Sequence, residues 1–345
     1  MIKDQKVQVS VIVVCYNEIR NIADCLQSLA SMDFPKEDYE ILCVDSLSTD
    51  GTREVIRDFM AHHSNIRLAD NPEKSIPKSR NIGVRASRFP YVAFTDADCV
   101  VPPNWLTRLV RGFDTLKNST PELAALGGTN RAPSGKTRFY DATNIIMKTM
   151  LGNRGSTQGK EFDRDLEVDH MPTLNILYEK SAIDAAGGFD EAFQFVCEDP
   201  DLNYRLTQAG RKIYYLTGAE VVHVFKPGFQ MWAERSFRYG WGRIQLLTKH
   251  PDHVTAVYFV PPMIVLLTLL PFFAGISSAF LWPVAAYGLM ILAYSVFYCL
   301  RQRRPDLLFH VILLYFITHF SFGLGEIWGI LGRSSHRANK QGSVK

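Results

Sequence analysis

The sequence predicts an α/β domain followed by membrane helices, and three observations lead to this expectation. Short runs rich in β-branched residues alternate with helical patterns through the first hundred residues, which is typical of a parallel sheet with helices on both faces. Polar residues follow the ends of these runs, where such sheets bind ligands. Residues 254–331 hold only 5 charged side chains in 78 positions, against 68 in the other 267. One part of the chain is therefore expected in water and the other in lipid.

The predicted strands of the first part are short and apolar, as expected for parallel strands buried on both faces. They occupy residues 7–15, 40–45, 66–69 and 91–95. Asn17 can cap a helix whose apolar residues recur at helical spacing over 22–29. The turn at 48–51 leads into a second helix, and residues 78–87 form a third, so strand and helix alternate.

The middle of the chain is less regular over residues 115–170. Its polar, Gly-rich part at 128–169 is expected to form mobile loops. Further elements are predicted after these loops: strands at 172–177 and 213–216, a turn at 187–190, and a helix at 200–209 capped near Asp199.

The last third of the sequence is predicted to meet a membrane. Residues 229–250 mix aromatic and basic side chains at helical spacing, which suits a helix at the membrane surface. Trp232 and Trp241 are expected at the lipid headgroups. Three apolar stretches follow, at about 254–277, 279–300 and 307–331. Each is long enough to span a bilayer core of roughly 30 Å.

Basic residues give conflicting indications of topology. The Arg-rich loop at 301–304 should be cytoplasmic by the positive-inside rule. The basic tail at 332–345 also favours the cytoplasm, which disagrees with three full spans unless Gly323, Gly325 and Glu326 interrupt the last stretch. We expect three spans in a multi-pass protein of the cell membrane, with the soluble part in the cytoplasm.

Composition and cysteine spacing exclude several classes of protein. The net charge of +3 argues against nucleic acid as a partner. The six cysteines form no CxxC pair and no Cys/His cluster of zinc spacing, which favours buried thiols in a reducing compartment. The first apolar run is short and interrupted by polar residues, so it is not predicted to be a signal peptide.

Asp96 and Asp98 follow directly on a predicted apolar strand. Two carboxylates at this spacing can approach one hard divalent cation and the phosphate that it holds, so Mn²⁺ or Mg²⁺ is the expected cofactor. A solvated turn explains the pair without a ligand, but the position at a strand end favours the metal. His223 could add a metal or phosphate contact, and a satisfied core histidine explains it equally well.

A second acidic pair, Glu198 and Asp199, precedes an amphipathic helix. An acid there could act as a general base, whereas a helix cap is the simpler explanation of Asp199 taken alone. Asp45 ends the second strand, where a nucleotide base or ribose could use it. Lys78 and Arg80 could reach phosphate or ribose oxygens, or be solvated helix charges. The sequence contains no Walker A or GxGxxG motif.

Six motifs in one order resemble glycosyltransferase family 2, whose members are inverting enzymes of the GT-A fold. They are VSVIVVCYNE, VDSLSTDGT, KSRNIGV, FTDADC, GGFDE and CEDPDLNYRL, over roughly residues 7–225. Each is weak alone, but six in order are specific. The resemblance implies a Rossmann-like domain that binds a nucleotide sugar, a divalent metal, and transfer by single displacement.

The resemblance also implies roles for individual residues. Tyr16 would stack on the nucleobase, and Asp45 would contact the nucleoside. Asp96 would face the ribose or metal, and Asp98 would ligate the metal. Asp199 would be the general base. The expected donor-binding set is Tyr16, Asn17, Glu18, Asp45, Lys78, Arg80 and Asp96, and the expected metal set is Asp98, Asp96 and His223.

Other residues are assigned to the acceptor or to the nucleobase. Glu198, Arg238, Trp241 and Arg243 are candidates for contacts with the acceptor or a diphosphate. Ser46 stands where the family often has a second acid, which leaves the nucleobase open.

The first hypothesis is therefore a membrane-anchored glycosyltransferase that takes a cytoplasmic nucleotide sugar and acts on a lipid-linked acceptor, such as a polyprenyl phosphate, or on a membrane-proximal glycan. The alternatives are a nucleotidyltransferase-like enzyme and a non-catalytic membrane scaffold or sugar-sensing module. The expected organisation is a GT-A domain at 1–228, an interfacial segment at 229–252, a membrane region at 253–331 and a basic tail at 332–345.

Overall fold

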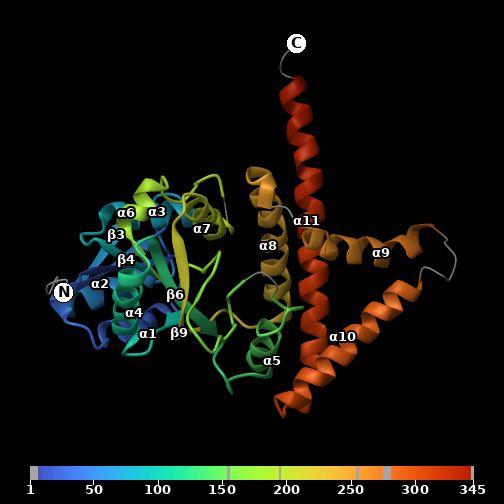
Figure 1. Cartoon of the computed structure of the whole chain (residues 1–345), viewed down its shortest axis with the longest axis horizontal. Helices are drawn as coiled ribbons and strands as arrows, with labels where there is room; N and C mark the ends of the chain where they lie inside the picture. The colour runs from blue at the N-terminus through green and yellow to red at the C-terminus, as the bar shows by residue number, and fades with distance from the viewer. Residues whose placement is uncertain (1–6, 154–155, 194–195, 254–255, 275–280, 343–345) are drawn as a thin grey trace. The chain divides into compact units, whose positions relative to one another are not determined.

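The computed structural model describes residues 7–153, 156–193, 196–253, 256–274 and 281–342. They form two compact units (Figure 1). The first comprises residues 1–133 and 155–225, and the second comprises 134–154 and 226–345.

A nine-stranded sheet forms the centre of the first unit, in the order β3-β2-β1-β4-β8-β6-β9-β5, with β7 also pairing with β9. The strands are β1 Val9–Cys15, β2 Tyr39–Asp45, β3 Ile66–Asp70, β4 Tyr91–Asp96, β5 Cys99–Val100, β6 Leu123–Arg131, β7 Leu166–Glu167, β8 Ile176–Glu179 and β9 Lys212–His223. The four strands predicted in the first part are all present, with ends that differ by a residue or two.

The prediction of a parallel sheet is right for four strand pairs and wrong for the others. β1 pairs parallel with β2 and β4, β2 pairs parallel with β3, and β6 pairs parallel with β9. β8 runs antiparallel to both β4 and β6, and β5 and β7 run antiparallel to β9. These directions depend on pairing between segments that are distant in the sequence, which local patterns do not report. The fold is therefore a mixed α/β sheet.

Helices cover both faces of the sheet, as predicted. Alternate residues of a strand point to opposite faces: Val11 and Val13 pack in the cluster that holds residues of α1, α2 and α4, whereas Ile12 packs in the cluster that holds residues of α3, α6 and α7. These helices are α1 Ile22–Ala30, α2 Thr52–His62, α3 Ile76–Ala86, α4 Trp105–Ser119, α6 Lys180–Ala185 and α7 Glu198–Gln208.

Part of the region predicted as mobile loops is regular structure. Residues 128–131 belong to β6, and α5 (Arg138–Met147) lies in the second unit. Gly128, the first glycine of that region, belongs to this strand. A Cβ at Gly128 would lie 1.7 Å from the Ala219 carbonyl oxygen, so glycine here permits two strands to approach closely.

The strand predicted at 172–177 is displaced in the structure. β8 begins only at Ile176, and the residues before it form a turn in which Asn175 N–H donates to the Pro172 carbonyl at 3.3 Å. The buried Asn175 amide group then donates to the Thr129 and Ala219 carbonyls at 2.7 and 3.1 Å. The side chain thus joins β6 and β9 ahead of the strand.

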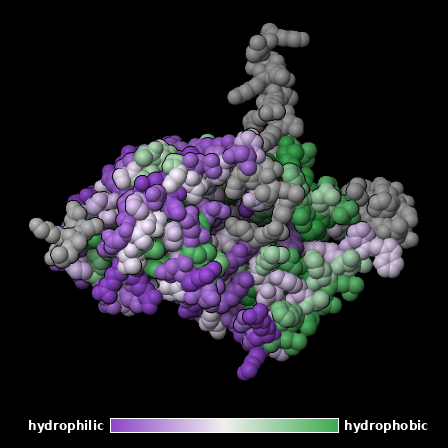
Figure 2. All heavy atoms as spheres, viewed as in Figure 1, coloured by the Kyte–Doolittle hydropathy of each residue, from purple (hydrophilic) through white to green (hydrophobic). Residues whose placement is uncertain are grey.

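The second unit is helical. After α5 it contains α8 Phe229–Lys249, α9 Val260–Ala274, α10 Leu281–Arg301 and α11 Leu308–Gly342, with short 3₁₀ turns between them. Among the described residues, two helical segments are long and apolar enough to cross a membrane, Trp282–Arg301 and Pro305–Gly332. Large apolar side chains are exposed on both, including Trp282 at 76% and Trp328 at 62%. Figure 2 shows hydrophobic residues gathered over these helices.

The first of the three predicted apolar stretches is occupied by α9, which has 15 residues. At about 1.5 Å per residue this helix is shorter than a bilayer core of roughly 30 Å. The predicted stretch boundaries at Ser277 and Ala279 lie outside the described residues. A crossing by this first stretch stays a prediction.

α8 packs closely on α11. A Cβ at Gly240 would lie 2.0 Å from the Phe322 carbonyl oxygen, and one at Gly325 would lie 2.0 Å from that of Phe237. The glycines therefore allow the two backbones to touch, and α11 continues through them without the interruption considered from the sequence. Trp232 is buried and its indole N–H donates to Thr318 at 2.8 Å. The expectation that Trp232 faces lipid headgroups is wrong, because helix packing uses its ring.

Candidate active site

Asp98 lies in a tight connection that joins two strands of the sheet. β4 ends at Asp96, Ala97 and Asp98 form a turn, and β5 starts at Cys99. β5 pairs antiparallel with the end of β9, which places Cys99 opposite His223. The Val224 N–H also donates to the Asp98 carbonyl at 2.7 Å. The sheet itself therefore brings His223 beside Asp98, although the two residues are far apart in the sequence.

The side chains of Asp98 and His223 form a compact donor cluster. Asp98 Oδ2 and His223 Nε2 are 3.1 Å apart. The Cys99 sulfur belongs to the same group, whose ligand atoms all lie within 4.8 Å of one another. Burial raises the pKa of the Cys99 thiol, with the neighbouring acids acting in the same direction. The cluster offers a carboxylate oxygen, an imidazole nitrogen and a sulfur atom.

The Asp98 carboxylate suits a divalent cation such as Mn²⁺ or Mg²⁺, which prefer oxygen ligands, and the His223 imidazole lies beside it. His223 is buried, and its Nδ1 has no hydrogen-bond partner within the described parts of the chain. The structure thus joins two of the three predicted metal ligands. Asp96 lies outside the cluster: its Oδ1 is 3.7 Å from Arg80 Nη2. Burial raises the pKa of Asp96, whereas Arg80 acts to lower it.

Arg80 and Glu198 form a buried ion pair between α3 and α7. Arg80 Nη1 donates to Glu198 Oε1, and the two side chains are 6% and 5% exposed. Burial raises the pKa of Glu198 to about 7, although Arg80 acts to lower it. The sequence predicts that Arg80 reaches donor oxygens and that Glu198 faces the acceptor or a diphosphate. In the structure each faces the other.

Asp199 lies in the first turn of α7 rather than at its cap. Cys197 occupies the cap position, with φ of 75°, and no side chain caps the helix. An Asp199 oxygen accepts a hydrogen bond from the Thr173 N–H at 3.3 Å. Burial raises the pKa of Asp199, while Arg80 and this hydrogen bond act to lower it. Asp199 is therefore not the N-cap residue, although a carboxylate in the first turn still suits the positive end of the helix dipole.

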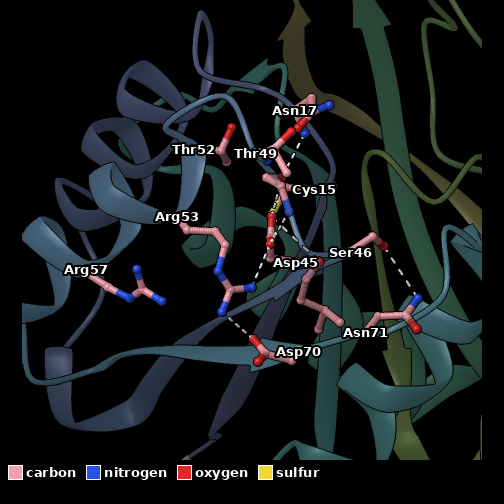
Figure 3. Close-up of polar contacts among 12 residues, drawn as sticks. Cys15, Asn17, Asp45, Ser46, Thr49, Thr52, Arg53, Arg57, Asp70 and Asn71 are labelled. Carbon is pink, nitrogen blue, oxygen red and sulfur yellow. Dashed lines mark hydrogen bonds and ion pairs between the residues drawn. The ribbon is translucent and has the colours of Figure 1, made fainter.

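Asp45 ends β2 and is fully buried, with its carboxylate already bonded inside the protein (Figure 3). Oδ1 accepts from Ser48 N–H and Arg53 Nη1, both at 2.8 Å. Oδ2 accepts from the Ser48 hydroxyl at 2.5 Å. Arg53 also binds Asp70 at 2.7 Å. A direct contact of Asp45 with a nucleoside would have to replace one of these partners.

The residues after β1 are held by the turn after β2. Asn17, with φ of 55°, accepts at Oδ1 from the Thr49 N–H at 2.9 Å. Tyr16 is 37% exposed, and Lys74 lies over its ring, 4.5 Å from the centroid. An exposed ring beside a cation suits stacking on a base and contact with phosphate.

The remaining donor-side candidates are Glu18 and Lys78. Burial raises the pKa of Glu18 to about 7; a hydrogen bond from Asn21 opposes this, and Asp98 and Asp96 add to it. Glu18 thus shares the electrostatic environment of the β4 acids. Lys78 pairs with Glu73, so its charge is partly compensated.

Arg238, Trp241 and Arg243 lie on α8, in the second unit. The Arg243 guanidinium lies 4.5 Å from the ring centroid of Tyr258 and 5.9 Å from that of Phe322. These contacts fix Arg243 within its own unit. A role for the three residues at the active site stays a prediction.

Sequence reasoning missed two contributors to the site. Cys99 joins the Asp98 cluster only because β5 pairs with β9, and Thr173 contacts Asp199 from a turn that the sequence predicts as a strand. Neither has a local sequence signal, because pairing between distant segments creates both contacts.

A family profile and individual proteins match this chain. The profile described as "Glycosyl transferase family 2" matches residues 10–185. The chain is 29% identical over 244 residues to "Glycosyltransferase AglE" of Haloferax volcanii, covering 69% of this chain and 73% of that protein. It is 22% identical over 330 residues, or 95% of this chain and 98% of the other, to the Methanococcus voltae protein named "Dolichyl N-acetyl-alpha-D-glucosaminyl phosphate 3-beta-D-2,3-diacetamido-2,3-dideoxy-beta-D-glucuronosyltransferase".

Among solved structures, the chain is similar to the mannosyltransferase PcManGT of Pyrobaculum calidifontis, which was solved with GDP-Man and Mn²⁺. The TM-score is 0.59 at 20% identity, over 94% of this chain and 88% of that one. At this identity the likeness shows the shared fold alone.

Proposed function

Because the chain belongs to glycosyl transferase family 2, we propose that it is a membrane-associated, inverting enzyme that transfers a sugar to a lipid-linked or membrane-proximal glycan acceptor. The family match and the named relatives make it a nucleotide-sugar-dependent glycosyltransferase of the GT-A fold. To this activity the proposal adds inversion at the anomeric carbon, a role for a divalent metal, and the class of acceptor.

The observation that carries the proposal is that the acids of the first unit form two centres with different partners. Asp98 lies against His223 at the β4–β5 turn. Asp199 lies at the start of α7 and is held by the Thr173 N–H. A single displacement needs this division, because the leaving diphosphate must be stabilised while a separate base activates the acceptor hydroxyl.

At the first centre, Asp98 and His223 would hold a divalent cation, and Asp96 would face the donor beside them. When bound, the metal would offset the negative charge that develops on the departing nucleoside diphosphate. Tyr16 would stack on the nucleobase, with Lys74 near the phosphates. Asn17, Glu18 and Lys78 remain candidates for the same donor site.

At the second centre, Asp199 would take the proton from the acceptor hydroxyl. The oxygen would then attack the anomeric carbon from the face opposite the leaving group, which inverts its configuration. The hydrogen bond from Thr173 orients the carboxylate without occupying all of its acceptor positions. Arg80 and Glu198 lie beside this centre.

The second unit supports a lipid-linked acceptor. Helices α10 and α11 each contain a segment of membrane-spanning length, with exposed apolar side chains, and such surfaces are stable when lipid covers them. A relative's name includes a dolichyl phosphate substrate, and a polyprenyl phosphate is the corresponding class here. Arg238, Trp241 and Arg243 on α8 would contact this acceptor or its diphosphate.

The proposed location is the cell membrane, with several spans and the catalytic unit on the cytoplasmic side. The Arg-rich turn between α10 and α11 supports this orientation by the positive-inside rule, provided that the first apolar stretch also crosses and forms a hairpin with α10. The orientation also places the donor site where nucleotide sugars are made.

The proposal is tested with the full chain purified in lipid nanodiscs. The chain is incubated with Mn²⁺, a panel of nucleotide sugars and a polyprenyl-phosphate-linked saccharide, and released nucleoside diphosphate is measured. We expect release from one donor that depends on both metal and acceptor, and a product of inverted anomeric configuration by NMR. Absence of release would contradict the enzyme assignment, and retained configuration would contradict single displacement.

A further inference from the structure

The Arg80 side chain connects three separate elements of the first unit. It starts from α3, pairs with Glu198 in the first turn of α7, and approaches Asp96 at the end of β4 with a distance of 3.7 Å from Nη2 to Oδ1. Its guanidinium also lies 5.6 Å from the ring centroid of Phe189. One side chain thus links the acid beside the proposed base to an acid of the donor site.

Arg80 is more buried than is expected of an arginine that binds a substrate directly. The whole residue is 5% exposed, and Glu198 is 4% exposed. A buried charge is tolerated only when a partner compensates it, and breaking such a pair leaves the other charge isolated. The Glu198 carboxylate therefore compensates the buried charge of Arg80, and this role requires no contact with an acceptor or a diphosphate.

Asn81, the next residue on α3, also bonds to the segment that leads into α7. Asn81 donates from Nδ2 to the Phe189 carbonyl, and its Oδ1 accepts from the Phe189 N–H, both at 2.8 Å. Asn81 Nδ2 also donates to Glu191 at 2.9 Å. These bonds hold the turn that precedes α7 onto α3. Asn81 thus holds the turn at 189–191, and Arg80 holds Glu198 in the first turn of α7.

We propose that Arg80 is a positioning residue whose pairing with Glu198 sets the spacing between Asp199 on α7 and Asp96 on β4. This inference rests on the proposed function, because it needs Asp199 as the base and Asp96 on the donor side. Asp199 follows Glu198 directly, so holding the Glu198 carboxylate also fixes the backbone that carries the base. Arg80 acts through these acids and contacts no substrate.

The alternative role for Arg80, a ligand of donor phosphate or ribose, makes different predictions. A ligand contributes to donor affinity, whereas a positioning residue contributes to the rate once the donor is bound. A displacement of about 1 Å at a catalytic group can lower a rate by roughly 10²-fold. Nucleotide affinity and kcat therefore separate the two roles.

The experiment compares Arg80→Met, Glu198→Gln and the double variant in the full chain in nanodiscs. We expect each single change to lower kcat for transfer by about 10²-fold, while the Kd for nucleoside diphosphate with Mn²⁺ stays within about threefold of wild type. Because both changes break one interaction, the double variant should lose no more than the worse single variant. Arg80→Lys keeps the charge without the forked geometry and should recover about tenfold in kcat.

Arg67→Met is the matched control. Arg67 pairs at 2.6 Å with the buried Glu40, and this pair joins β3 to β2 and contains no residue of α7. We expect a drop in Tm comparable to that of Arg80→Met, with kcat within about threefold of wild type. If Arg80→Met does not fold, Arg80→Lys and Glu198→Gln carry the comparison.

Three results would overturn the proposal. The first is a rise of tenfold or more in the Kd for nucleoside diphosphate in Arg80→Lys or Arg80→Met, which would make Arg80 a donor ligand. The second is additive losses in the double variant. The third is an equal loss of kcat in Arg67→Met. If wild type transfers no sugar, the proposed function fails and this inference fails with it, whereas active wild type with any of these results rejects the Arg80 role alone.

Discussion

The ends of β2 and β4 look alike in the sequence and differ in the folded protein. Both strands are parallel neighbours of β1, and each ends at an aspartate. At the β2 end, Asp45 is fully buried and bonded to Ser48 and Arg53. At the β4 end, Asp96 lies 3.7 Å from Arg80, and the side chain of Asp98, two residues further on in the turn, is 20% exposed and lies against His223.

The difference comes from the element that each strand leads into. After β2 the chain forms a turn and enters α2, so that the turn supplies the hydroxyl of Ser48 and the helix supplies Arg53 as internal partners. After β4 it turns at once into β5, which pairs with β9 and so brings in the imidazole of His223. An acid near a strand end is therefore a stronger ligand candidate when the next element brings a second ligand beside it.

The largest effect is expected for Asp98→Ala. Losing the metal contact should lower Mn²⁺-dependent turnover by about 10⁴-fold, since a bound metal contributes several kcal/mol to charge stabilisation. The fold should remain, because Asp98 lies in a turn. Nucleoside diphosphate release is the assay and Tm the control. Full activity with normal Mn²⁺ dependence would reject the metal assignment.

Asp199→Asn should have the next largest effect, a loss of about 10³-fold in transfer, within the range typical of a missing general base. Donor affinity should be unchanged, because only the acceptor side is altered. Burial raises the pKa of Asp199, so the wild-type rate should fall with decreasing pH, beginning above the usual range for aspartate. Equal losses in donor affinity and turnover would indicate a structural role instead.

Local sequence patterns predicted which segments carry the candidate site residues, but they could not predict contacts between distant segments. Local patterns identified the strands that carry Asp45, Asp96 and Asp98, because apolar runs and turn residues are local. The antiparallel β8 and the β5–β9 pairing were not predictable in this way, because they depend on contacts between distant segments. For the same reason, the sequence could not show that Arg80 faces Glu198 rather than solvent.

Asp45→Asn should mainly affect stability. The change removes the charge that Arg53 and Ser48 compensate, and the loss of charged hydrogen bonds at a buried site costs about 2 kcal/mol. We expect a lower midpoint in urea unfolding and a change of at most a few-fold in the KM for the donor. A large rise in this KM with unchanged stability would instead support direct contact with the nucleoside.

The smallest effect is expected for replacing Arg238 and Arg243 together with alanine. Each cation near a membrane surface contributes about 1 kcal/mol of attraction to anionic lipid, so the KM for a polyprenyl-phosphate-linked acceptor should rise about tenfold. The Kd for nucleoside diphosphate with Mn²⁺ should stay near the wild-type value. Arg235→Ala, which removes one charge from the same helix, is the control for general attraction. Unchanged transfer to the lipid acceptor in the double variant would reject the role of α8.

The central claim is that the end of β4, and not the end of β2, holds the divalent cation. Titration of Mn²⁺ into the purified chain, followed by the electron paramagnetic resonance signal of free Mn²⁺ with UDP and in parallel with GDP, tests it directly. We predict that wild type and Asp45→Asn bind Mn²⁺ alike and that Asp98→Ala binds at least about 10²-fold more weakly. Wild-type binding in Asp98→Ala, or its loss in a folded Asp45→Asn, would contradict the claim.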